Sequence, residues 1–76
     1  MRSISDIATE IYCDWKSVNY AARPYLEAMM LLDSVDDRYG YDSGRSVVLY
    51  FLNNATTWRG ETAKRIKTEL RKAVAR

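Results

Sequence analysis

Apolar residues recur every three or four positions in the first part of the chain, which is the spacing of one face of an α-helix. They are Ile4, Ile7, Ala8, Ile11, Trp15 and Val18. This pattern predicts a helix from about Ser3 to Lys16. Ser3 and Asp6 resemble a capping pair at its start, where a hydroxyl and an acid meet the free N–H groups. Cys13 is predicted to project from the opposite face.

A second helix is predicted from Ala21 or Ala22 to about Asp33. Pro24 suits its first turn, where the missing N–H costs little. Its apolar residues cover most of the circumference, namely Tyr25, Leu26, Met29, Met30, Leu31 and Leu32. A helix that is apolar nearly all round belongs in an interior.

The rest of the chain alternates turn-rich and apolar segments. Residues 33–44 hold Asp, Ser and Gly without a sustained period, which predicts a loop. Residues 45–54 (RSVVLYFLNN) fit a buried strand or a helix. A helix is preferred because no second β-like run exists to pair with a strand. A turn at 53–57 precedes a last helix from about Thr57 to Val74, so we expect one all-α domain over 1–76, a compact bundle of about four helices.

Two helices with so much apolar surface are difficult to bury completely in 76 residues. Homodimerisation, or a groove for another protein, would cover the surplus. Leu31, Tyr39 and Tyr41 are the interface candidates, because tyrosine is favoured at protein interfaces. The alternative is that the two tyrosine rings cover one end of the core.

Charge is distributed unevenly along the chain. Positions 57–76 hold seven of the twelve basic residues against two acids, whereas positions 1–42 hold four against eight acids. The whole chain is only +2, so overall basicity is weak support for a nucleic-acid partner. The asymmetry indicates an anionic partner, unless the acidic part folds against the basic helix and neutralises it.

The last helix is expected to present three faces. Its core stripe contains Ala63, Ile66, Leu70, Ala73 and Val74. Glu61, Arg65, Glu69 and Lys72 form a ladder of alternating charge at helical spacing. Lys64, Lys67 and Arg71 fall on a third line with no acid at pairing distance on their outer side, and Gly60 lies on the same line one turn earlier. These three cations are the phosphate-contact candidates; the alternative is an ordinary solvated face near the negative end of the helix dipole.

Enzyme chemistry has little support in this composition. The chain has no histidine, which removes the commonest general base and metal ligand. Cys13 therefore lacks a base, and the loop aspartates do not match a calcium-loop spacing. We expect no enzyme, cofactor, metal or small-molecule substrate. With no signal-peptide pattern and no apolar run of about 18 residues, a soluble cytoplasmic protein is expected.

Nearly the whole chain resembles a group of short, uncharacterised helical proteins from gut anaerobes and their mobile elements. The most distinctive segments are YLEAM at 25–29 and TWRGETA at 57–63. The resemblance implies a small stand-alone protein, such as an accessory protein of a mobile element, and transfers no site residues. We therefore expect a non-enzymatic interaction module that binds another protein or itself. The alternative is a nucleic-acid-binding accessory protein that uses the basic last helix.

Overall fold

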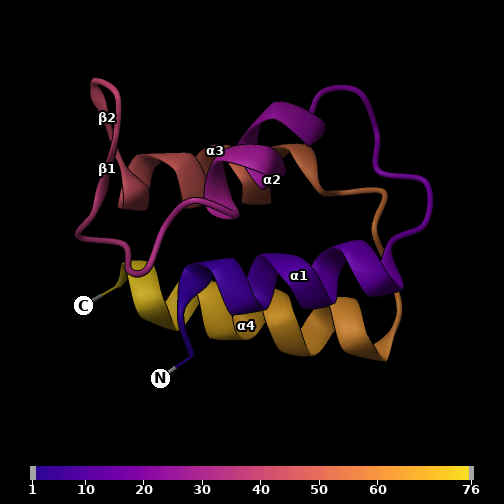
Figure 1. Cartoon of the computed structure of the whole chain (residues 1–76). Helices are drawn as coiled ribbons and strands as arrows, with labels where there is room; N and C mark the ends of the chain where they lie inside the picture. Colours follow the sequence, from indigo (N-terminus) through magenta and orange to yellow (C-terminus); the bar gives the residue numbers. More distant parts are fainter. Residues whose placement is uncertain (1, 76) are drawn as a thin grey trace.

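The described part of the chain consists of four helices and a short hairpin. The computed structural model describes residues 2–75. The elements in chain order are α1 (Ile4–Asp14), α2 (Arg23–Met29), β1 (Arg38–Tyr39), β2 (Asp42–Ser43), α3 (Gly44–Asn54) and α4 (Glu61–Val74), as Figure 1 shows. The predicted small, mostly helical bundle is therefore confirmed, and the segment assigned to 45–54 is a helix rather than a strand.

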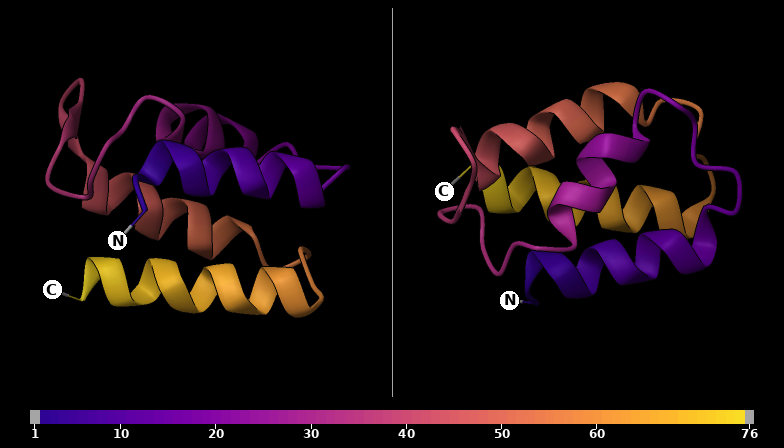
Figure 2. Two further views of the ribbon diagram at one scale, coloured as in Figure 1. Left: turned by 60° about the horizontal axis from the view of Figure 1, so that its bottom comes forward. Right: turned by 45° about the horizontal axis from the view of Figure 1, so that its top comes forward.

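The four helices form a closed ring of neighbours. Each helix packs against the next one along the chain, and α4 returns to pack against α1. Figures 1 and 2 show α1 and α4 side by side and antiparallel, with α2 and α3 packed across them. Because every helix has two neighbours, the apolar faces all meet in one core.

Helix α1 begins where the sequence predicts. The Ser3 hydroxyl accepts a hydrogen bond from the Asp6 N–H at 3.1 Å, which confirms the capping pair. The N–H groups of Ile4 and Ser5 donate to the carbonyls of Asp33 and Leu32, at 3.0 and 2.8 Å. The start of α1 is thereby fastened to the segment that follows α2.

The prediction that the second helix reaches Asp33 is wrong. Helix α2 ends at Met29, and the chain then tightens into turns. The N–H groups of Leu31 and Leu32 each bond a carbonyl three residues back instead of four, at 3.0 and 3.2 Å. Because of these tighter turns, the chain runs toward α1. The first N–H groups of α1 need the carbonyls of Leu32 and Asp33 as acceptors.

The predicted loop over 33–44 contains an antiparallel hairpin. Arg38 pairs with Ser43 and Tyr39 with Asp42. Gly40 has a φ of 63° and Tyr41 a negative φ, and glycine at the first turn position is typical of a type II′ hairpin turn. Two-residue strands carry no alternation of apolar and polar residues, so the periodicity of the sequence contains no signal for them.

The hairpin leads directly into α3, and neighbouring backbone packs closely around Gly44 at this junction. Ser43 caps the helix by accepting from the Ser46 N–H at 3.1 Å, and the Gly44 N–H donates to the Asp37 carbonyl at 2.6 Å. A Cβ at position 44 would lie 2.8 Å from the Ser34 carbonyl oxygen. Glycine is required here because neighbouring backbone occupies the space of a side chain.

Three aromatic rings occupy one end of the core. Trp15 stacks on Trp58 with centroids 5.7 Å apart, and Phe51 meets both rings edge-on. The Trp58 Nε1–H donates to the Asp14 carboxylate at 2.8 Å. The largest fully buried side chains are Phe51, Ile4, Ile7, Ile11, Leu26, Met29, Leu32, Ile66, Leu70 and Val48. Most of the apolar surface of α2 and α3 is therefore absorbed by the core of a single chain.

Candidate functional site

A shallow hollow of about 320 Å³ opens beside the first half of α4. Its lining comprises Trp58, Arg59, Gly60, Ala63, Lys64, Lys67 and Arg71, and we call it the basic hollow. All four ionisable residues of this lining are cations. Across residues 2–75, none of the four takes part in an ion pair. The hollow therefore brings together all three predicted phosphate-contact residues and adds Arg59.

Lys67 is more constrained than a lysine on a solvated line. Its Nζ donates to the Trp58 carbonyl at 2.6 Å and lies 5.8 Å from the centroid of the Trp58 ring. Burial lowers the pKa of Lys67, and the nearby charges of Arg71 and Arg59 lower it further. Like charges therefore crowd together in the hollow, and an anion would relieve their repulsion.

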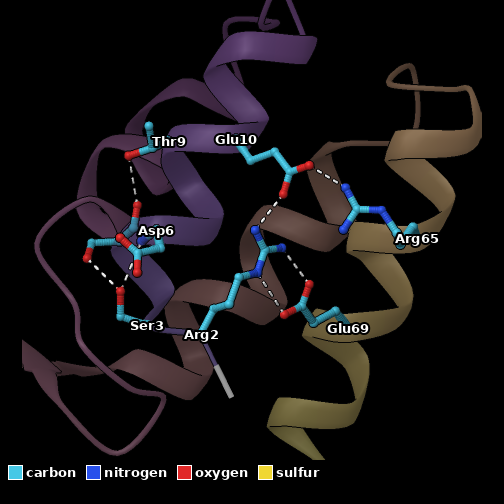
Figure 3. A network of polar contacts seen from close by, with 8 residues as sticks. Arg2, Ser3, Asp6, Thr9, Glu10, Arg65 and Glu69 are labelled. Atoms are coloured by element: carbon cyan, nitrogen blue, oxygen red, sulfur yellow. Dashed lines mark hydrogen bonds and ion pairs between the residues drawn. The ribbon is translucent and has the colours of Figure 1, made fainter.

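The predicted charge ladder along α4 is replaced by pairing with α1. Figure 3 shows Arg2 between the carboxylates of Glu10 and Glu69, and Arg65 reaching across to Glu10. The Arg2 guanidinium lies 2.5 Å from Glu10 and 2.6 Å from Glu69. The ladder is wrong because Arg2, which precedes α1, binds Glu69 at two points, and Glu10 of α1 binds Arg65. Spacing within α4 reveals neither partner.

This four-residue network shifts the pKa values of Glu10, Glu69 and Arg2 in the directions expected for ion pairs. Hydrogen bonds from Arg2 lower the pKa of Glu69, and those from Arg2 and Arg65 lower the pKa of Glu10. The two carboxylates in turn raise the pKa of Arg2. In this network two carboxylates balance two guanidinium groups, and the cations of the basic hollow lie outside it.

The interface candidates lie on two segments. Leu31 follows the end of α2 and is 73% exposed, whereas Tyr39 and Tyr41 are on the hairpin. Tyr39 is 44% exposed and Tyr41 is fully exposed. A fully exposed ring covers no core, so the alternative role of Tyr41 as a cover for the core end is wrong.

A second hollow, of about 490 Å³, lies where the starts of α1 and α3 meet the end of α4. Its polar side chains are engaged within the protein. Ser3 caps α1, Arg2 binds Glu10 and Glu69, and Arg45 binds the Val74 carbonyl and Asp36. Tertiary packing alone creates this hollow, so no sequence pattern indicated it, and it offers few unpaired groups to a ligand.

The described residues offer no metal-binding cluster. Cys13 is exposed on α1, as its position on the helix predicted. Within residues 2–75 no three His, Cys, Asp or Glu side chains cluster closely enough to hold a metal ion. None of the helices described above has the length and apolar character needed to cross a membrane.

Comparison with known proteins assigns no family to the chain and no role to these surfaces. The chain matches no protein-family model, no curated protein and no solved structure. The resemblance to short proteins of gut anaerobes and mobile elements therefore stays a prediction.

Proposed function

We propose that this protein is a non-enzymatic interaction module that binds another protein through its hairpin. The observation that carries the proposal is the full exposure of Tyr41 at the tip of a hairpin that is itself held against α3. Exposed tyrosines supply large contact areas with few rotatable bonds, which is why they are enriched at binding hot spots. Leu31, on the segment that follows α2, is a second exposed apolar side chain.

The charges around the hairpin favour a particular kind of partner. Residues 33–42 carry four aspartates against Arg38 alone. The side chain of Asp36 is 84% exposed, and Asp42 is exposed on β2. An apolar centre with an acidic rim complements a protein surface with an apolar pocket and a basic rim.

The base of the hairpin is well ordered, which lowers the entropic cost of binding. The Asp37 carboxylate accepts hydrogen bonds from the N–H groups of Asp33 and Ser34, at 2.8 and 3.3 Å. The Asp37 carbonyl accepts from Gly44, where α3 begins. Tyr41 is therefore presented from a support that is already formed in the free protein.

Tyr20 offers a matched control for the hairpin tyrosine. It is 94% exposed and belongs to the segment between α1 and α2. Figure 1 shows this segment at the other end of the molecule from the hairpin. Proteins retained by the wild-type chain from an extract of its source cells would be purified and titrated against three chains: wild type, Tyr41→Ser and Tyr20→Ser. We expect Tyr41→Ser to weaken binding by about 30-fold, the effect of a hot spot of about 2 kcal/mol, and Tyr20→Ser to leave it unchanged.

Three results would count against this function. One is that no purified protein binds the wild-type chain directly. A second is equal loss of affinity in both variants. A third is a concentration-dependent dimer in analytical ultracentrifugation that Tyr41→Ser abolishes, since the hairpin would then contact a second copy of the chain.

The lack of histidine supports a binding role over an enzymatic one, and the single cysteine supports a cytoplasmic location.

A further inference from the structure

We propose that the basic hollow binds the phosphate groups along a nucleic-acid strand. The site goes beyond the hairpin proposal and is independent of it. The hairpin and the first turn of α4 lie at opposite ends of the molecule in every view of Figures 1 and 2. One surface can therefore fail its test while the other passes.

The first argument is the gathering of four cations in one hollow whose lining contains no acid. The protein neutralises Arg2, Arg65 and Arg45 with carboxylates. Other cations, such as Arg38 and Lys72, also lack an ion pair within residues 2–75, so the distinctive feature of the basic hollow is that four unpaired cations share one lining. Cations that lie close together without counter-charges destabilise a fold unless an anion joins them.

The second argument is the rigid placement of the central cation. The Lys67 ammonium is held by the Trp58 carbonyl and by the face of the Trp58 ring. Trp58 is in turn fixed by Trp15 and by the Asp14 carboxylate. A flexible lysine loses side-chain entropy when it is held in this way, and here the loss is already incurred in the free protein.

The third argument concerns the shape of the ligand. Lys64 and Arg71 are seven residues apart on α4, which places them about 10 Å apart along the helix axis. Arg59 continues the row beyond the start of the helix, and a Cβ at Gly60 would meet nothing within 4 Å. A strand that repeats its phosphates along its length matches a row of this length better than a single phosphate ion does.

The salt dependence of binding provides the test. Fluorescence anisotropy with labelled duplex DNA, single-stranded DNA and RNA would be recorded between about 50 and 200 mM salt. If four phosphates are neutralised, affinity for the duplex should fall about 100-fold over this range, with a logarithmic slope of about −3.6. The double variant Lys64→Gln/Arg71→Gln should bind more weakly and lose about half of that slope.

The control removes the same charge elsewhere. Arg38→Gln/Lys72→Gln changes one cation on the hairpin and one on α4 outside the basic hollow. It should keep the wild-type slope, and melting curves of both double variants should match that of the wild type, because all four side chains are exposed. Equal loss in the two double variants would overturn the site.

Three other outcomes would overturn the proposal that the ligand is a nucleic acid. One is the absence of saturable binding by any of the three nucleic acids at about 50 mM salt. Another is displacement of the oligonucleotide by inorganic phosphate beyond the effect of chloride at equal ionic strength, which would indicate a small phosphate ligand. The last is polyglutamate binding as tightly as the oligonucleotide, which would mean that charge alone is recognised.

Discussion

Trp58 joins the core to the basic hollow, and its replacement tests both roles. The side chain is 3% exposed, stacks on Trp15 and meets Phe51 edge-on. Replacing a buried tryptophan with alanine costs about 3–5 kcal/mol, because contacts are lost and a cavity remains. A chain of this length has a total stability of roughly 4–11 kcal/mol at the usual value per residue. Trp58→Ala should therefore remove a large part of the stability.

Trp58→Phe separates packing from hydrogen bonding. It keeps an aromatic ring against Trp15 but removes the Nε1–H that donates to Asp14. Asp14 is exposed, so water can replace the lost donor, and the expected cost is about 1–2 kcal/mol. For a domain of this size that corresponds to a fall in Tm of roughly 5–15 °C.

Urea denaturation followed by far-UV circular dichroism measures both changes without relying on tryptophan fluorescence. The exposed Tyr20 provides the control, because Tyr20→Ala should change stability by less than about 0.5 kcal/mol. A Trp58→Ala protein with the wild-type urea midpoint would refute the packing described here. It would also remove the support for a rigidly held Lys67.

Two further predictions concern the hairpin junction and the ion-pair network. Gly44→Ala should destabilise the fold by about 1–3 kcal/mol, since its Cβ would meet backbone at 2.8 Å; a Tm equal to that of the wild type would contradict this. Arg2 holds the pKa of Glu69 below its usual range, so the carboxylate stabilises the fold above the ordinary glutamate pKa and that contribution is lost as pH falls through the folded-state value. Urea midpoints measured from about pH 7 down to pH 3 should fall less steeply for Glu69→Gln than for wild type, and high salt should reduce the difference; parallel curves would show that the pair contributes nothing.

The fold was largely predictable because helical periodicity is a local property. The buried residues of α1, from Ile4 to Ile11, repeat at helical spacing and need no knowledge of their neighbours. The end of α2 was not predictable in this way. Its apolar residues continue to Leu32, but the first N–H groups of α1 require acceptors from that segment. A long-range hydrogen bond therefore decides a boundary that local propensity places three or four residues later.

The candidate site likewise has one part that the sequence predicts and another that it does not. Lys64, Lys67 and Arg71 were placed together because they share one face of one helix. Arg59 was not among the predicted phosphate contacts, because the turn at Gly60, with a φ of 115°, determines where the preceding residue lies. The partners of Glu69 escaped notice because the competing cation comes from 67 residues away. Spacing within a helix predicts which side chains are neighbours. It does not show whether a group from elsewhere in the chain will bind one of them instead.

The packing of α1 against α4 has a consequence for the newly made chain. About sixty residues separate the end of α1 from the end of α4, so at ordinary rates of translation roughly 3 to 12 seconds pass between their syntheses. During that interval α2 can shield only part of the isoleucine face of α1, since α4 contributes the remaining contact. A ribosome-bound intermediate lacking α4 should thus expose isoleucine side chains, making it a natural client for a hydrophobic-binding chaperone.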